Sequence, residues 1–261
     1  MRGGGNGRSP LVHPSAIIGT EVILGPGCEV GPFCRFEGKV TVGAGCRFGT
    51  GVVVGTEPMD RSYQGEESVV AIGQNNVFFE YVTVHRACGA GKMTVIGDGN
   101  YIMNYVHIAH NCRLGNNCVL TNGVQLGGYS EVADGANLGG LTGVHQFCRV
   151  GKLAMVGAHS YVNRDIPPYV LAAGRPCRVR GLNLVGLRRA GMAQEKIAVL
   201  AELFRILYRS GLNLSQALGK IERELRAGCA DDEVNEFLEF CYRSQRGIEL
   251  RAGPEEVTDD L

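Results

Sequence analysis

Nearly every sixth residue of the chain is large and apolar between Val12 and Val162. Of the 26 positions divisible by six in this span, 23 are Val, Ile, Leu or Phe. The exceptions, Asp60, Glu66 and Ala90, leave the register unchanged and predict loops near residues 56–70 and 87–94 that replace whole repeats. A period of six fits neither an amphipathic helix nor a single strand. It indicates a solenoid in which short strands alternate with turns.

Two further positions of the repeat carry small residues. Glycine follows the apolar residue in 13 of the 23 repeats, which predicts tight turns with backbone angles that glycine adopts most easily. Four residues after the apolar one, the chain often has cysteine, and this position holds Cys28, Cys34, Cys46, Cys88, Cys112, Cys118 and Cys148. We expect these thiols to be small buried hydrophobes rather than metal ligands or nucleophiles.

The repeat ends after Val162, and the remaining pattern is helical. Residues 192–211 place Ile197, Leu200, Leu203 and Leu207 at helical spacing, and two more amphipathic segments follow. The sequence therefore predicts a mainly β chain: a disordered segment 1–10, a β-solenoid over 11–180, a helical domain over 181–250 and a flexible acidic tail over 251–261.

Charge and hydropathy narrow the class of protein. The chain has 26 basic and 26 acidic residues, without the basic excess that a nucleic-acid binder shows. Residues 1–9 lack the apolar core of a signal peptide, and no window has the roughly 18 apolar residues of a membrane span. We expect a cytoplasmic protein with reduced thiols, no membrane span and no nucleic-acid partner.

The six-residue pattern resembles that of the hexapeptide-repeat acyltransferases. This resemblance implies a left-handed parallel β-helix with three repeats in each triangular coil. Periodicity alone gives no handedness, and the general rule for parallel crossovers predicts the opposite hand. Coils stack at the strand spacing of about 4.8 Å, so that positions three repeats apart in the sequence share a column.

The histidines offer three kinds of chemistry. A zinc site of the kind found in γ-class carbonic anhydrases would need an H-x4-H pair, whereas His107 and His110 are spaced H-x2-H and His85 precedes them too closely in the sequence. A Gly-x-Ser-x-Gly nucleophile is absent from the sequence, and the cysteines occupy core positions. Direct acyl transfer is the simpler proposal, and it needs a general base and an oxyanion donor.

Column stacking suggests where both groups lie. His110, Gly128 and Gln146 follow one another at intervals of three repeats, and the backbone of Gly128 would pass about 5 Å from that of His110. Gly128 has no side chain to block an approaching thioester carbonyl. A solvated turn histidine is the alternative for His110, although its clustering with His107, His145 and Gln146 favours a site.

An ordered series of motifs gives a closer resemblance. "VHP", "GPFC", "VTVHR", "HIAHNC", "TGVHQFCRVG", "RDIPPYVLAAGRP", "GLNLVGLRRAG" and "LYRSG" run from Val12 to the helical tail. They resemble the UDP-N-acetylglucosamine O-acyltransferase family of lipid A biosynthesis. The resemblance implies a homotrimer that moves a 3-hydroxyacyl chain from acyl carrier protein to the 3-position of a UDP-sugar, with no cofactor and no metal.

The same resemblance assigns roles to individual residues. His110 matches the general base and Gly128 the oxyanion donor. Matches to substrate-binding residues are Asp60, His107, Asn122, Tyr129, His145, Gln146, Asn183 and Arg189. Ala158 matches the region that sets acyl-chain length. Because acyl carrier protein is acidic, we also expect a basic docking patch, for which Arg205, Arg209 and Arg243 are candidates.

Five positions depart from the family pattern, and all of them match positions around the acceptor. Asn111 and Tyr129 replace an aspartate and a histidine, and Met59, Ser62 and Val185 replace glutamine, lysine and glutamate. An aspartate would stabilise an imidazolium by charge, whereas Asn111 can only orient it. A UDP-sugar with a 3-amino group is therefore an alternative acceptor. A hexapeptide enzyme that uses acetyl-CoA and a non-catalytic or metal-binding solenoid also stay open.

Overall fold

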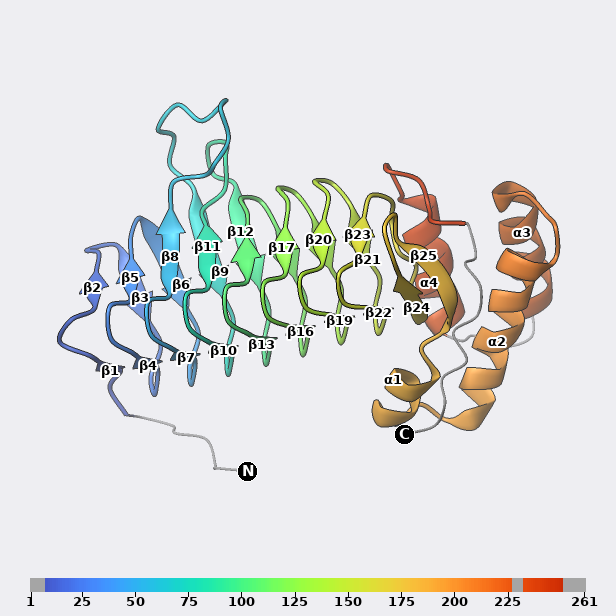
Figure 1. Ribbon diagram of the computed structural model, residues 1–261, viewed down its shortest axis with the longest axis horizontal. Helices are drawn as coiled ribbons and strands as arrows, with labels where there is room; N and C mark the ends of the chain where they lie inside the picture. Colours follow the sequence, from blue (N-terminus) through green and yellow to red (C-terminus); the bar gives the residue numbers. More distant parts are fainter. Residues whose placement is uncertain (1–7, 227–231, 251–261) are drawn as a thin grey trace.

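Short strands line the three faces of a long solenoid, and helices pack at its C-terminal end (Figure 1). The computed structural model describes residues 8–226 and 232–250. The expected flexible tail over 251–261 lies outside the described residues, as does most of segment 1–10.

The strands form three sheets, here called A, B and C. Sheet A contains β1 (Leu11–Val12), β4 (Glu29–Val30), β7 (Arg47–Phe48), β10 (Val77–Phe78), β13 (Tyr101–Ile102), β16 (Val119–Leu120), β19 (Asn137–Leu138), β22 (Met155–Val156), β24 (Val170–Ala173) and β25 (Arg178–Leu182). Sheet B contains β2 (Ile17–Ile18), β5 (Arg35–Phe36), β8 (Val53–Thr56), β11 (Thr83–His85), β14 (His107–Ile108), β17 (Gln125–Leu126), β20 (Gly143–Val144) and β23 (Tyr161–Val162). Sheet C contains β3 (Val22–Leu24), β6 (Lys39–Val42), β9 (Val69–Ile72), β12 (Met93–Ile96), β15 (Arg113–Leu114), β18 (Glu131–Val132) and β21 (Arg149–Val150).

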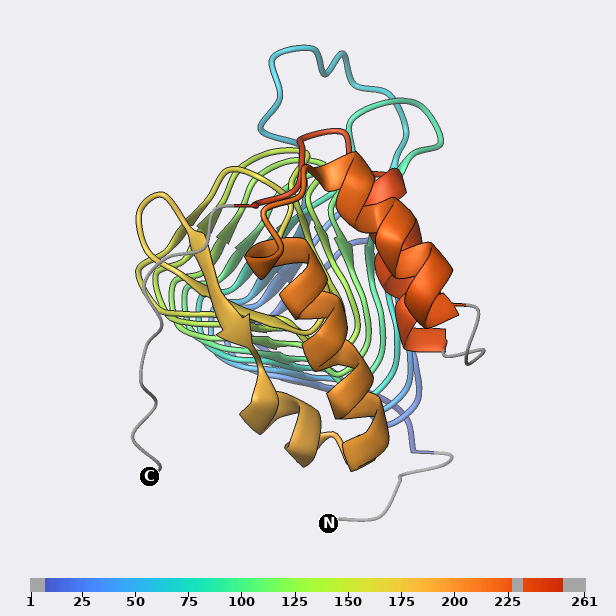
Figure 2. The ribbon, with the colours of Figure 1, turned by 90° about the vertical axis from the view of Figure 1, so that its right-hand side faces the viewer.

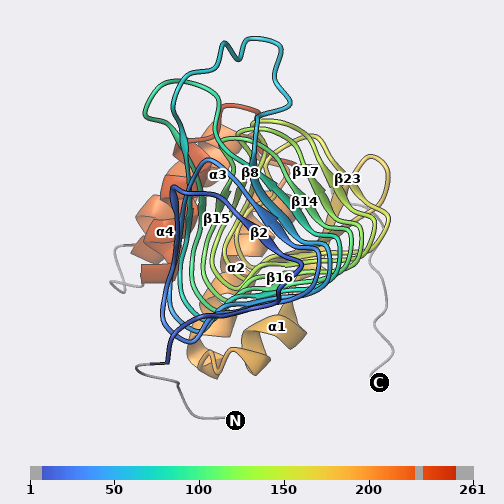
Figure 3. The ribbon, with the colours of Figure 1, turned by 90° about the vertical axis from the view of Figure 1, so that its left-hand side faces the viewer.

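Away from the two loops, successive coils pair in parallel with the expected offset of three repeats. His107 pairs with Gln125, which pairs with Gly143. Seen from the N-terminal end, the chain runs from sheet A to B to C anticlockwise as it recedes (Figure 3). The β-helix is therefore left-handed, as the family resemblance implies, and the general crossover rule does not hold for it.

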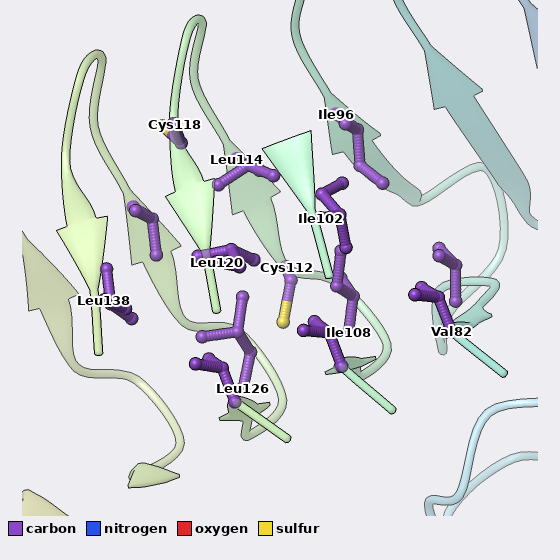
Figure 4. Close-up of a cluster of buried hydrophobic side chains, with 14 of the residues drawn as sticks. Val82, Ile96, Ile102, Ile108, Cys112, Leu114, Cys118, Leu120, Leu126 and Leu138 are labelled. Carbon is purple, nitrogen blue, oxygen red and sulfur yellow. The ribbon is translucent and has the colours of Figure 1, made fainter. Parts of the chain in front are cut away.

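The residues of the six-residue repeat fill the interior of the solenoid (Figure 4). Ile108, Leu120 and Leu126 are at most 1% exposed, and the seven repeat cysteines are at most 7% exposed. The thiols of Cys112 and Cys118 donate to backbone carbonyls of the next coil at 3.2 Å. The expectation of small buried hydrophobes is confirmed for six of these cysteines, which pack in the interior. Cys88 is buried in the loop after β11 instead, where its thiol contacts the polar side chains of Ser62 and Glu66.

The repeat glycines have a different role from the one expected. Gly55 is the only one of the 13 glycines after the apolar position that has a positive φ. Close approach of neighbouring coils explains the others, since a Cβ on Gly25 would lie 2.7 Å from the backbone nitrogen of Ala44. The left-handed residues come two positions later, where Asn111 has a φ of 61° and Tyr129 a φ of 60°.

Two loops leave the solenoid at the corner between sheets B and C (Figure 1). Loop 57–68 connects β8 to β9, and loop 86–92 connects β11 to β12. The loops bind each other: Ser68 Oγ donates to the Ala87 carbonyl at 2.5 Å, and the Gly89 N–H donates to Glu66 Oε1 at 2.6 Å. They therefore form one packed unit above the B–C corner.

Helices close the C-terminal end of the solenoid (Figure 2). They are α1 (Leu184–Arg189), α2 (Gln194–Arg209), α3 (Leu214–Ile221), the π-helix η1 (Glu222–Arg226) and α4 (Asp232–Tyr242). The predicted apolar face of α2 is buried against α3 and α4, with Leu200 and Leu203 at most 2% exposed. In the part of the chain that the structure describes, no helix is long and apolar enough to cross a bilayer.

Candidate active site

The B–C corner brings His110 and Gly128 into direct contact. The two residues follow β14 and β17, whose strands are neighbours in sheet B. A Cβ on Gly128 would lie 2.6 Å from both Cε1 and Nε2 of His110. Only glycine leaves room for the imidazole to lie over the next coil, and the ring is held there with His110 only 8% exposed.

The backbone N–H of Gly128 is available to a ligand. The adjacent N–H groups are used, because Gly127 donates to the Val144 carbonyl at 2.9 Å and Tyr129 donates to the His110 carbonyl at 3.1 Å. The Gly128 N–H has no acceptor among residues 8–226 and 232–250. A free N–H beside a histidine is the arrangement that oxyanion stabilisation needs.

A hydrogen bond from its Nδ1 orients the imidazole of His110. Nδ1 lies 2.9 Å from Oδ1 of Asn111. An amide oxygen only accepts, so Nδ1 carries the hydrogen in the neutral ring and Nε2 carries the lone pair. Nε2 is one of the two ring atoms that would lie 2.6 Å from a Cβ on Gly128, so this nitrogen lies over Gly128, whose own N–H is free.

A carboxylate from loop 57–68 faces the same nitrogen. Oδ2 of Asp60 lies 3.8 Å from Nε2 of His110. The backbone N–H and the hydroxyl of Ser62 both donate to Asp60 Oδ1, at 2.9 and 2.8 Å. These bonds hold the pKa of Asp60 below its usual range. Asp60 is therefore charged at neutral pH and can accept hydrogen bonds from a ligand.

His107 has a different environment, on the outer face of β14. Its Nδ1 lies 2.8 Å from the hydroxyl oxygen of Thr83, and its ring meets that of His85 edge-on with centroids 5.2 Å apart. Burial, followed by the charges of His85 and His110, lowers the pKa of His107 to about 4. His107 is therefore neutral at neutral pH and suited to hydrogen bonding.

Tyr129 and Phe147 form an aromatic wall beside His110. The Tyr129 ring meets that of His110 edge-on with centroids 5.3 Å apart, and it stacks on Phe147 at 4.8 Å. The wall borders a cavity of about 350 Å³ lined by Asn111, Arg113, Tyr129, Glu131, Phe147, Arg149, Arg243 and Gln245. Phe147 was not among the residues predicted from sequence, although it follows Tyr129 by three repeats and so belongs to the same column.

Two further predicted residues lie at the same corner on the following coil. Gln146 is exposed in the column of His110 and Gly128. His145 precedes it, and its Nδ1 donates to the Gln146 carbonyl at 3.0 Å. The corner therefore gathers seven of the ten predicted residues in one chain: Asp60, His107, His110, Gly128, Tyr129, His145 and Gln146.

Three predicted residues lie elsewhere in the same chain. Asn122 follows β16 at the corner between sheets A and B, and Ala158 lies in its column. Asn183 caps α1, accepting from the Gly186 N–H at 3.0 Å and donating to the Leu153 carbonyl at 2.9 Å. Arg189 is exposed in the last turn of α1, which lies away from the loops (Figures 1 and 2).

The other singled-out residues have ordinary surroundings. Arg205 forms two hydrogen bonds with Glu202, Arg209 lies over the Phe204 ring, and Arg243 binds Glu239 at 3.2 Å. Met59 and Val185 are exposed. Among the described residues, no group of three His, Cys, Asp or Glu side chains is arranged to hold a metal ion.

Comparisons with known proteins agree on one family. The family model described as "Udp N-acetylglucosamine O-acyltransferase; Domain 2" matches residues 165–249, and the hexapeptide-repeat model matches residues 21–56 and 93–128. The chain is 38% identical over 256 residues to an acyl-[acyl-carrier-protein]–UDP-N-acetylglucosamine O-acyltransferase of Anaeromyxobacter dehalogenans, covering 91% of this chain and 98% of the relative. It is 41% identical over 208 residues to that of Synechocystis, covering 80% and 74%.

Solved structures are similar over nearly the whole chain. The UDP-N-acetylglucosamine acyltransferase of Bacteroides fragilis superposes with a TM-score of 0.79 at 34% identity, covering 92% of this chain and 98% of that one. The Arabidopsis enzyme gives a TM-score of 0.78 at 31% identity, covering 92% and 98%.

Proposed function

The chain belongs to the family of UDP-N-acetylglucosamine O-acyltransferases, and from this premise we propose that it catalyses the first acylation of lipid A biosynthesis. A 3-hydroxyacyl chain would pass from acyl carrier protein to the 3-position of UDP-N-acetylglucosamine. The single observation that carries the proposal is that the His110 ring lies against Gly128, whose N–H has no acceptor among the described residues, at one corner of the solenoid.

We propose direct transfer without an acyl-enzyme. Nε2 of His110 takes the proton of the sugar 3-hydroxyl as that oxygen attacks the thioester carbonyl carbon. The carbonyl oxygen becomes an oxyanion, which the Gly128 N–H binds. When the tetrahedral intermediate collapses, the carbon–sulfur bond breaks and the imidazolium returns the proton to the departing thiolate. The Asp60 carboxylate lies near Nε2 and would hold the sugar during these steps.

The identity of the acceptor sugar is the part of the proposal most open to change. The group that bonds to Nδ1 of His110 is the neutral amide of Asn111 rather than a carboxylate. A 3-amino group is a stronger nucleophile than a hydroxyl and needs less help from the base, so the 3-amino analogue of UDP-N-acetylglucosamine is the second candidate.

An acyl-transfer assay tests the function and the acceptor together. The purified protein, given 3-hydroxyacyl carrier proteins of several lengths, is expected to acylate UDP-N-acetylglucosamine, its 3-amino analogue, or both. The ratio of kcat/KM for the two acceptors measures the preference. Transfer to neither acceptor with any chain length would refute the proposed function, and transfer from acetyl-CoA instead would favour a different hexapeptide acyltransferase.

We further propose that the working enzyme is a homotrimer. The A–B corner carries a ridge of exposed apolar residues, Phe33, Tyr81, Tyr105 and Leu141, each at least 50% exposed. Exposed apolar side chains gathered along one corner in this way favour an interface. If the A–B corner of one chain faced the B–C corner of its neighbour, Asn122 of the first would meet His110 of the second. Arg189 would reach the acceptor in the same way.

Mixed trimers test this arrangement. His110→Ala and Arg189→Ala chains, each inactive alone, are expected to regain activity when co-expressed. If every site uses His110 of one chain and Arg189 of another, random assembly leaves about a quarter of the sites intact. If both residues came from one chain, every site would carry a substitution and the mixture would stay inactive.

We place the docking of acyl carrier protein beside the same corner. Arg243 lines the cavity next to Tyr129 together with Arg113 and Arg149, so this end of the molecule offers an acidic partner several cations. Arg205 and Arg209 lie on α2 and would extend that surface. We also propose that the enzyme works in the cytoplasm, because the nine described cysteines are free and buried, as suits a reducing compartment.

A further inference from the structure

We infer that Asn111 is a positioning residue that selects the tautomer of His110, and that the backbone of Cys88 in loop 86–92 fixes Asn111. The kinetic part of this inference rests on the proposed function, and its structural part does not. Neither Asn111 nor Cys88 would touch the substrate. Their effect would pass entirely through the ring of His110.

The amide of Asn111 is held at both ends by one residue. Its Oδ1 accepts from the Cys88 N–H at 2.9 Å, and its Nδ2 donates to the Cys88 carbonyl at 3.1 Å. If the amide turned over and its oxygen and nitrogen exchanged places, donor would face donor and acceptor would face acceptor, so the pair of bonds fixes which atom is oxygen. Because Oδ1 also faces His110 Nδ1 at 2.9 Å, the backbone of Cys88 determines which nitrogen of the base carries hydrogen.

An aspartate could not form the same pair of bonds. Its second oxygen would face the Cys88 carbonyl at the position where Nδ2 now donates, and two acceptors without a proton between them repel. The neutral amide is therefore matched to loop 86–92 in a way that a carboxylate is not. The two bonds to the backbone of Cys88 thus explain why asparagine suits position 111 in this chain.

Loop 86–92 also contacts a residue that orients the carboxylate facing Nε2 of His110. The thiol of Cys88 lies 3.4 Å from Ser62 Oγ, and Ser62 orients the Asp60 carboxylate that faces His110 Nε2. The five residues His110, Asn111, Cys88, Ser62 and Asp60 thus form a closed ring of contacts. Each imidazole nitrogen is oriented through one side of that ring, so displacement of loop 86–92 would disturb both.

Asn111→Gly is the informative deletion. Position 111 has a φ of 61°, where glycine is unstrained, so the turn survives while the amide is lost. We expect kcat to fall about 10- to 100-fold because Nε2 is no longer held as the base. KM for the UDP-sugar should change less than about threefold, since no substrate contact is removed.

Asn117→Gly is the matched control. Asn117 occupies the same turn position one repeat later, with a φ of 54°, at the corner between sheets C and A. Gly99 and Gly135 occupy this position on the coils before and after it, so the substitution should leave kcat and KM unchanged. A comparable loss in Asn117→Gly would mean that turn geometry, rather than the amide, matters, and would overturn the inference.

Asn111→Asp supplies a readout that a purely structural role would not move. The groups near the ring that can carry charge are Asp60, His107 and Tyr129, and Cys88 and Glu66 act in turn on Tyr129. A new carboxylate at position 111 adds negative charge beside Nδ1 and favours the imidazolium. We expect the acidic limb of the kcat/KM profile to move to higher pH, and a profile that superimposes on that of the unaltered enzyme would overturn the inference.

The tautomer of His110 can be measured independently of acyl-transfer activity. In the full chain labelled with ¹⁵N-histidine, the His110 signals are identified by their loss in His110→Ala. We expect a protonated Nδ1 and a bare Nε2 in the unaltered protein and a mixture of tautomers in Asn111→Gly. A bare Nδ1 in the unaltered protein would overturn the inference, whereas lack of acyl transfer with the expected tautomer would refute only the proposed function.

Discussion

Replacing His110 with alanine is expected to lower kcat by roughly 10²–10⁴-fold, the usual range for removal of a general base. The effect should be large because the neighbouring histidine cannot take over the role of the base. His107 lies nearby, but burial and neighbouring charge lower its pKa to about 4, so it is too weak a base. Steady-state acyl transfer with saturating acyl carrier protein and UDP-sugar measures the effect.

The control for this substitution is His13→Ala. His13 is exposed near the start of the solenoid and contacts Ser15, so its loss should leave kcat unchanged. Circular dichroism should give the same spectrum for both variants, because His110 lies outside the apolar interior. A fall in kcat of less than tenfold in His110→Ala would rule out His110 as the base.

Gly128→Ala is expected to be nearly as damaging, although it adds only one methyl group. The new Cβ would lie 2.6 Å from two atoms of the His110 ring, closer than carbon atoms tolerate, so the imidazole must move. Displacement of a catalytic group by about 1 Å can lower the rate about 10²-fold. We therefore expect kcat to fall by at least about that factor, measured in the same assay as for His110→Ala.

Gly181→Ala is the matched control, because a Cβ at that position in β25 has no neighbour within 4 Å. It should keep full activity and the same thermal unfolding midpoint. The close approach of Gly128 to the ring would be contradicted if Gly128→Ala turned over at the normal rate.

The arrangement of the solenoid could be predicted from sequence because one feature, the six-residue repeat, determines it. An apolar residue at every sixth position has to face a common interior, and Ile108, Leu114 and Leu120 do so. The hand of the coil is not contained in that period and came only from the family resemblance. The role assigned to the repeat glycines was wrong, since crowding between coils cannot be read from a single repeat.

The site was predictable only where columns determine it. His110 and Gly128 meet because they are three repeats apart, which is one full coil, and no other information is needed. The contacts of Ser62 and Cys88 depend on how two irregular loops pack, for which the sequence contains no period. Asn122 and Arg189 lie away from His110 within one chain. Their predicted roles in substrate binding therefore depend on the proposed assembly of several chains.

Both loops leave the solenoid at one corner and return to it in register. β9 still pairs with β6 before it and β12 after it, with Val69 opposite Lys39 and Met93. The inserted segments therefore leave the strand pairing on either side of them intact. In evolutionary terms, the solenoid and the surroundings of His110 can diverge separately, because loop 57–68 reaches His110 through Asp60 while lying outside the stacked strands. Because loops 57–68 and 86–92 bind each other, protein engineers would have to exchange the two together between relatives as one cassette.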